Sequence, residues 1–245
     1  MADCLRSLTE TESVHTYANR MENQTMKIIG IAASPRAKES QTLRLVQAVL
    51  DGACAAGAVT ECVDLCELKI EYCASCRVCY AKGRCVHKDD FDALYGKMLA
   101  SDGIVWGSPN YFSSVSAQMK TFIDRMSDGV HCQVFTGKYG CTVASAGGPN
   151  HAEATDYMNR LLVTFGASVV GAAGGSMSIA GSMDAAESEA RKLGQALVAA
   201  IETKRAYPEQ EAAHAEIRAR FKHLVTMNEK AWPHEYEHWL NKGWL

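Results

Sequence analysis

Apolar segments of the chain alternate between strand-like and helix-like patterns from residue 26 onward, and this alternation limits the possible fold more than any other feature. Runs rich in β-branched and other apolar residues predict five strands, over 26–33, 59–65, 103–107, 139–145 and 167–172. Apolar residues at helical spacing fill the intervals. Such an alternation indicates parallel strands joined by right-handed crossovers, which is a doubly wound α/β fold with ligands beyond the carboxyl ends of its strands.

The helical segments have recognisable beginnings. Ser40 can cap a helix that continues to about Gly52. Further helices are predicted over 89–100, 115–126, 151–165 and 183–204. The cysteine-rich segment 73–85 lies between the second strand and the helix 89–100, and we expect it to be a loop.

Three regions follow from this pattern. Residues 1–25 form a polar N-terminal leader without the apolar stretch of a secretion signal, and residues 26–204 form the α/β domain. Residues 205–245 hold a helix, 209–230, and an aromatic arm with three tryptophans. Exposed aromatic side chains at this density would promote aggregation, so the arm is expected to dock on its own domain or on a partner subunit. We favour a homodimer or homotetramer.

Charge and hydropathy exclude several classes of function. The chain has 25 Lys and Arg against 28 Asp and Glu, a formal net charge of -3, without a block of like charges. We therefore expect no binding to nucleic acid or to a membrane surface. No apolar run approaches the roughly 18 residues that a membrane-spanning helix needs. The ten cysteines, without a secretion signal, favour a thiol or metal role in the cytoplasm over disulfides.

The loop after the first strand has the chemistry of a phosphate site. Ser34, Ser40 and Thr42 supply hydroxyl groups, and Arg36 supplies a guanidinium. Ser40, Gln41 and Thr42 lie at the N-terminus of the predicted helix, where backbone N–H groups are free. The glycine patterns of dinucleotide folds and of nucleotide hydrolases are missing here, which favours a monophosphate. The alternative, weighed evenly on these residues alone, is that Ser40 and Thr42 only cap the helix and Arg36 is solvated.

Two more loops should lie at the same edge of the sheet. Residues 108–114 follow the third strand, and residues 145–150, with two glycines, follow the fourth. In a sheet of order 2-1-3-4-5, the ligand crevice lies where these loops meet the first one. A flat aromatic ligand could bind there, although both segments could also be ordinary turns.

At this point the sequence resembles a known family. The segments SPRAKESQT, GSPNYFSSVSAQMKTFIDR and ASAGG are similar to the three flavin loops of NADPH-dependent FMN reductase-like proteins of flavodoxin-like fold, over about residues 26–175. The resemblance implies that the first loop holds the FMN phosphate through Ser34, Arg36, Ser40, Gln41 and Thr42; Gln41 stands where many relatives have Asn. It implies that the isoalloxazine ring is lined by Pro109, Asn110, Tyr111, Phe112 and Ser113 and flanked by Ser145, Gly147 and Gly148.

The densest signal is a run of four thiols at Cys73, Cys76, Cys79 and Cys85. Four thiolates can hold one iron-sulfur cubane, and Gly83 can provide the turn that returns the last of them. The spacing is similar to the compact cysteine motif of the iron-sulfur flavoproteins, a branch of the same family, and so implies a [4Fe–4S] cluster. A structural zinc site and free or reversibly oxidised thiols remain open as alternatives.

These features predict an FMN-dependent oxidoreductase that passes electrons between a one-electron donor such as ferredoxin, the cluster and FMN. The flavin carries the chemistry, so no catalytic side chain is required. The alternatives are a cluster-free NAD(P)H-dependent FMN or quinone reductase, a flavodoxin-like electron carrier without turnover, and a zinc-stapled interaction module. Arg125 is interpreted as architectural.

Overall fold

A computed structural model describes residues 25–245, so the predicted leader lies almost entirely outside the described residues. Five parallel strands form one sheet of order β2-β1-β3-β4-β5, as predicted. The strands are β1 (Lys27–Ala32), β2 (Val59–Asp64), β3 (Gly103–Pro109), β4 (Tyr139–Ala146) and β5 (Ser168–Ser176). The register places Ala32 beside Asp64 and Gly107, and Pro109 beside Ser145. The carboxyl ends of the strands therefore meet at one edge.

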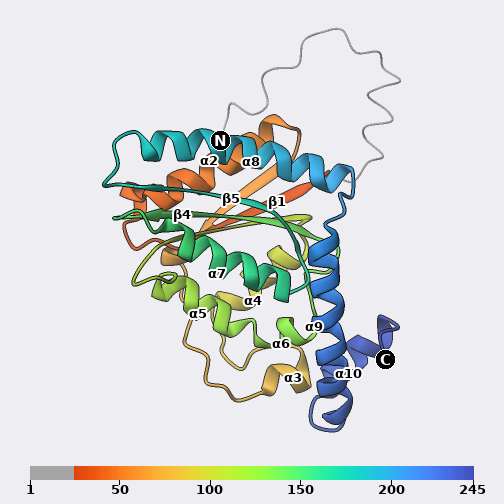
Figure 1. Ribbon diagram of the computed structural model, residues 1–245. Coiled ribbons are helices and arrows are strands. Elements are labelled where there is room, and N and C mark those ends of the chain that lie inside the picture. Colours follow the sequence, from red (N-terminus) through yellow and green to blue (C-terminus); the bar gives the residue numbers. More distant parts are fainter. Residues whose placement is uncertain (1–24) are drawn as a thin grey trace.

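Helices cover both faces of the sheet (Figure 1). One face carries α2 (Gln41–Ala55) and α8 (Ser182–Glu202), and the other carries α4 (Phe91–Leu99), α5 (Ala117–Arg125) and α7 (His151–Thr164). Each face has its own core, because successive residues of a buried strand point to opposite sides. The larger core gathers around Trp106, Phe122 and Met158, and the second around Val46, Val105 and Leu197.

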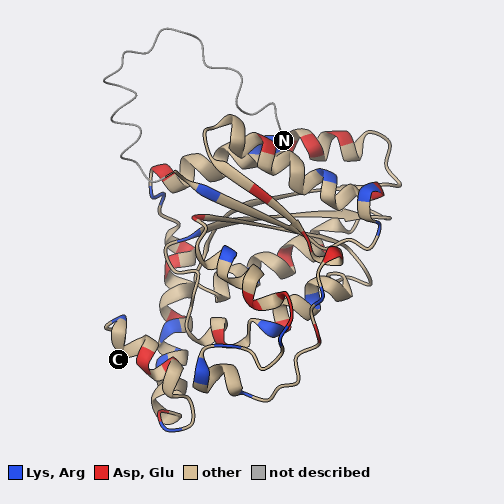
Figure 2. Ribbon diagram, turned by 180° about the vertical axis from the view of Figure 1, so that it is seen from behind, with Lys and Arg blue, Asp and Glu red and all other residues tan. Residues whose placement is uncertain are grey.

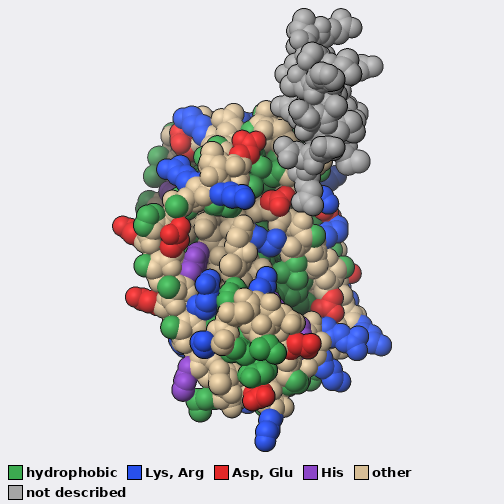
Figure 3. Space-filling model, turned by 90° about the vertical axis from the view of Figure 1, so that its right-hand side faces the viewer, with side chains coloured by type: hydrophobic (Ala, Val, Ile, Leu, Met, Phe, Trp, Pro, Cys, Tyr) green, Lys and Arg blue, Asp and Glu red, His purple; other side chains and the backbone are tan. Residues whose placement is uncertain are grey.

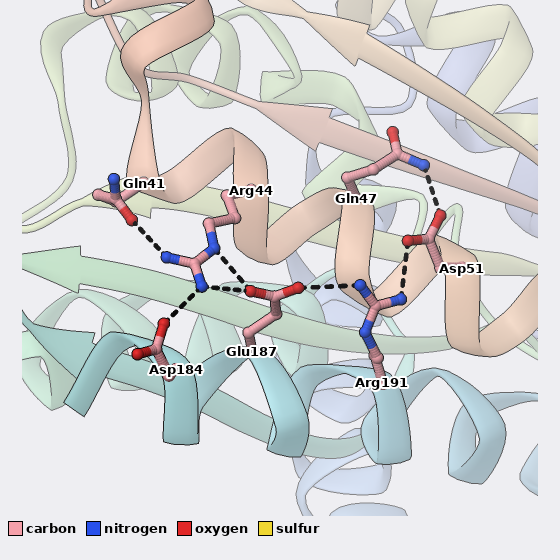
Figure 4. A network of polar contacts seen from close by, with 7 residues as sticks. All are labelled: Gln41, Arg44, Gln47, Asp51, Asp184, Glu187 and Arg191. Carbon is pink, nitrogen blue, oxygen red and sulfur yellow. Dashed lines mark hydrogen bonds and ion pairs between the residues drawn. The ribbon is translucent and has the colours of Figure 1, made fainter. Parts of the chain in front are cut away.

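The two helices α2 and α8 pack unusually close together because glycines lie at their crossing. An added Cβ at Gly194 would stand 1.9 Å from the carbonyl oxygen of Val49, and one at Gly52 would stand 2.0 Å from that of Arg191. No side chain fits into such a space. An exposed network along the same crossing joins the helices through Arg44, Asp184, Glu187, Arg191 and Asp51 (Figure 4).

The segment between β2 and α4 differs from the predicted loop. It begins with a 3₁₀ turn, η2 (Leu65–Glu67), and the cysteine run contains a short helix, α3 (Val78–Lys82). Gly83 ends α3 in the left-handed conformation, at φ 66°, which is the turn expected of it. A second short helix, α6 (Ser127–His131), follows α5. Of the helices in residues 25–245, none is long and apolar enough to cross a membrane.

The C-terminal region descends along the side of the sheet as α9 (Pro208–Met227) and turns back as α10 (Pro233–Asn241) (Figure 1). Prolines at the first helical positions begin both helices. The aromatic arm is thus largely helical. Figure 3 views this side of the molecule, where apolar and charged side chains are interspersed.

The arm tryptophans pack against the same chain. Trp239 is fully buried and donates from Nε1 to the carbonyl oxygen of His131 over 3.0 Å. Trp232 stacks on the His131 ring, with centroids 5.2 Å apart, and meets Tyr80 of α3 edge-on at 4.9 Å. The buried Glu235 carboxylate lies 3.0 Å from His131 Nδ1. Docking within one chain accounts for the aromatic density, and the oligomeric state stays a prediction.

Candidate functional site

A pocket lies at the carboxyl edge of the sheet, where three predicted loops meet. Eight predicted residues line it, namely Ser34, Arg36, Gln41, Pro109, Asn110, Tyr111, Ser145 and Gly147. Their segments are distant in sequence, but parallel strands of order β2-β1-β3-β4-β5 bring their ends together. The fold therefore assembles the crevice that the sequence indicates.

Two hydroxyl groups of the first loop are used within the protein. A 3₁₀ turn, η1 (Ala37–Glu39), leads into α2, and Ser40 caps α2 by accepting from the Leu43 amide at 2.9 Å. Thr42 is buried, and its Oγ1 lies 2.7 Å from Ser145 Oγ on the third loop. Neither residue lines the pocket. The capping interpretation holds for Ser40, while Thr42 fastens the first loop to the third.

The second loop is fixed to the third by its backbone and by Asn110. The Asn110 amide donates to the Ser145 carbonyl at 2.8 Å, and its side-chain Nδ2 donates to the Asn150 carbonyl. Its Oδ1 is buried without a hydrogen-bond partner among the described residues. A buried acceptor without a donor is costly, so Oδ1 in the pocket lining fits a ligand that presents an N–H group.

Besides Ser40 and Thr42, three further predicted residues lie outside the pocket lining, namely Phe112, Ser113 and Gly148. Phe112 is fully exposed, and both Phe112 and Ser113 have left-handed backbone, at φ 50° and 63°. Gly148 also lies outside, whereas an added Cβ at Gly147 would meet open space. The left-handed pair turns the tip of the second loop outward, so the predicted set is broader than the lining.

The sequence reasoning missed two residues of the lining, Ala146 and Met177. Met177 follows β5, and its amide donates to the Ala146 carbonyl at 2.8 Å. The signal was available, because the loop after a fifth parallel strand must reach the same edge as the other loops.

The four cysteines of the motif line a second pocket, which shares no lining residue with the first. Left-handed residues at Ser75 (φ 52°) and Arg77 (φ 61°) wind the chain between the first thiols and α3. Cys73 and Cys76 are exposed, while Cys79 and Cys85 are partly buried. The motif therefore places all four cysteines in the lining of one pocket.

The base of the cysteine segment is held by acidic side chains. Asp89 accepts from the Glu71 amide at 2.9 Å and from both terminal nitrogens of Arg125, at 2.6 and 3.1 Å. Asp90 accepts from the Lys69 amide at 2.8 Å. Burial by itself raises the pKa of Asp89, but the bonds from Arg125 and the two amides of Glu71 and Phe91 outweigh it and lower the pKa to about 2. Arg125 is buried and architectural, as interpreted.

One thiol of this pocket, Cys79, is partly buried. Burial, and secondarily the charge of Asp128, raises the pKa of Cys79 to about 12. Within residues 25–245 no group of cysteine, histidine or acidic side chains is close enough to hold a metal ion as placed. Two buried nitrogens in the lining, Arg125 Nε and His87 Nε2, have no partner there. A group with acceptor sulfurs would satisfy such nitrogens as N–H donors.

Comparison with known proteins agrees with this geometry. The model of the NADPH-dependent FMN reductase family matches residues 26–182. An iron-sulfur flavoprotein of Archaeoglobus fulgidus is 37% identical over 223 residues, covering 90% of this chain and 100% of that protein.

Solved structures support the fold. The NAD(P)H:quinone oxidoreductase from Methanothermobacter marburgensis superposes with a TM-score of 0.56 at 18% identity, covering 71% of this chain and 98% of that one. A flavodoxin, WrbA-like protein from Agrobacterium tumefaciens gives 0.52 at 18% identity, covering 74% and 100%. The chain therefore belongs to the NADPH-dependent FMN reductase family, as a flavin-dependent oxidoreductase with the flavodoxin-like fold and iron-sulfur flavoproteins among its relatives.

Proposed function

We propose that this oxidoreductase binds FMN in the three-loop pocket and a [4Fe–4S] cluster at Cys73, Cys76, Cys79 and Cys85, and passes electrons between a one-electron donor such as ferredoxin and the flavin. The observation that supports it best is that all four thiols line one pocket of a chain from the FMN reductase family. When bound, the flavin supplies one- and two-electron chemistry.

The residues of the first pocket bind and orient the FMN. Arg36 and Gln41, the first residue of α2, would hold the phosphate, since a guanidinium and a helix N-terminus favour negative charge. Asn110 Oδ1 could accept a hydrogen bond from the ring, and Gly147 would leave space for the ring to approach the backbone. Tyr111 and Met177 flank the opening and limit the access of water.

The residues of the second pocket fit a cluster in their chemistry. Four cysteines are a complete ligand set for a cubane, and coordination would draw the sulfurs closer together and remove their protons. Arg125 Nε and His87 Nε2 would hydrogen-bond the sulfurs, which stabilises added negative charge.

A second candidate is a cluster-free NAD(P)H-dependent FMN or quinone reductase. The observation that favours it is that the described residues do not gather into a metal-binding group. Zinc in the same four-thiol set is a third possibility.

We also propose a cytoplasmic location, since the exposed thiols Cys73 and Cys76 stay reduced only in a reducing compartment.

Anaerobic purification followed by iron, sulfide and zinc analysis tests the proposal. We expect about four iron and four sulfide per chain, together with flavin bands and a broad shoulder near ~400 nm. Replacing Cys79 with Ser should remove the shoulder and leave the flavin bound, because the two pockets share no residue. One zinc per chain, or no metal, would replace the cluster proposal with the alternatives.

A further inference from the structure

The cysteine segment and the three residues that follow it, 73–88, carry four exposed basic residues and no acidic residue. Between Tyr72 and Lys88 the charged side chains are Arg77, Lys82, Arg84 and Lys88, and all four are exposed. The whole chain has a net charge of -3, so this segment is opposite in sign to the remainder. We call these four residues the basic cysteine surface.

The nearest acidic side chains along the chain are already engaged. Asp89 is buried against Arg125, Asp90 accepts from the Lys69 amide, and Glu71 lies 3.6 Å from Lys69 Nζ. None of the four basic side chains forms an ion pair with another residue in 25–245.

Two basic residues at the crossing of α2 and α8 are arranged differently. Arg44 and Arg191, at the crossing of α2 and α8, each contact two acidic side chains (Figure 4). By contrast, Figure 2 shows Lys and Arg on α3 and its flanking loops at the lower end of the molecule. The four basic side chains are thus exposed and without an ion pair among the described residues, which leaves them available to a partner.

The basic cysteine surface also lies where electrons could enter. Cys73, Cys76 and Arg77 are exposed, and all three line the cysteine pocket. We propose that this surface is the docking site of an acidic one-electron carrier protein. The inference rests on the proposed function, and it adds the place and the charge of the partner. On transfer, the carrier is oxidised by one electron and this chain is reduced by one, and no bond is made or broken.

Charge complementarity suits such an encounter. Unpaired charges around a redox site raise the association rate and select partners of opposite sign, with an effect that falls as salt increases. Lys82 and Lys88 do not line the cysteine pocket, whereas Arg77 does. The two lysines can therefore be reversed in charge without altering the lining, which separates docking from the holding of the four thiols.

The test compares Lys82→Glu/Lys88→Glu with a control, Arg160→Glu/Lys204→Glu, in which two exposed basic residues outside the cysteine segment are reversed. The probe is an oxidised, acidic plant-type ferredoxin, and its binding to the holoprotein is measured by titration calorimetry at low and high salt. We expect the first variant to bind at least about tenfold more weakly at low salt. The difference in affinity between this variant and the native chain should vanish at 0.5 M salt. The control variant should bind as the native chain does.

The proposal is overturned if the two variants weaken binding equally, or if neither does. It is also overturned if the first variant loses iron while its binding is unchanged, because the lysines would then only neutralise the charge of the thiolates. Binding of the oxidised carrier needs no electron transfer. If the anaerobically purified native protein contains no iron but still binds the ferredoxin through Lys82 and Lys88, the cluster proposal fails and the docking surface is still supported.

Discussion

The buried ion pair between Asp89 and Arg125 should be the strongest single polar support of the cysteine segment. Its side chains are 2% and 0% exposed, and the carboxylate accepts four hydrogen bonds, two from the guanidinium and two from the amides of Glu71 and Phe91. Asp89→Asn keeps the shape but leaves a buried guanidinium without its counter-charge. Breaking one side of a buried pair costs about 3–5 kcal/mol. We expect the free energy of unfolding to fall by that amount at pH 7.

The matched control is Asp124→Asn on α5, the helix that also carries Arg125. Asp124 pairs with Lys120 at 2.5 Å, but both side chains are nearly half exposed, so its loss should cost no more than about 0.5 kcal/mol. Urea unfolding followed by circular dichroism measures both variants. Equal losses in the two, or a loss below about 1 kcal/mol for Asp89→Asn, would refute the assignment of the cost to burial.

The pH dependence provides a second check on the same pair. The pKa of Asp89 is lowered from 3.8 to about 2, so ionised Asp89 stabilises the fold fully above about pH 4 and loses this contribution as the pH falls toward 2. The lowering corresponds to about 2 kcal/mol. The stability difference between the native chain and Asp89→Asn should therefore narrow by that amount between pH 4 and pH 2. A constant difference would contradict the lowered pKa.

Three further predictions concern other parts of the molecule. Arg36→Ala should weaken FMN by about tenfold or more and riboflavin far less in fluorescence titrations, since the loss is that of a charge-assisted phosphate contact; equal weakening would remove the phosphate assignment. Gly194→Ala should cost about 1–3 kcal/mol in thermal unfolding through overpacking against α2, whereas Gly96→Ala, which faces open space in α4, should not destabilise the protein. Trp232→Ala should speed the labelling of Cys79 by thiol reagents in metal-free protein, because the ring packs on Tyr80; Trp244→Ala, whose ring packs on Trp239, should not.

Much of the fold could be predicted because its determinants are local. The apolar runs and helical spacings identify all five strands, and a parallel sheet then requires crossovers of one hand. The end of each strand follows from the same pattern, so the meeting of Ser34, Asn110 and Ser145 at one edge was predictable. The serine directly before the first helical residues also predicted the N-cap at Ser40.

Contacts between distant segments could not be predicted in this way. The sequence alone determined that four thiols are close along the chain, and that the surrounding charge is basic. Only the tertiary structure decided that Asp89 is buried against Arg125, that Trp232 covers Tyr80, and that Thr42 bonds to Ser145 instead of facing the pocket. The physical reason is that burial and pairing depend on which surfaces pack together across the whole fold, whereas spacing and propensity act over a few residues.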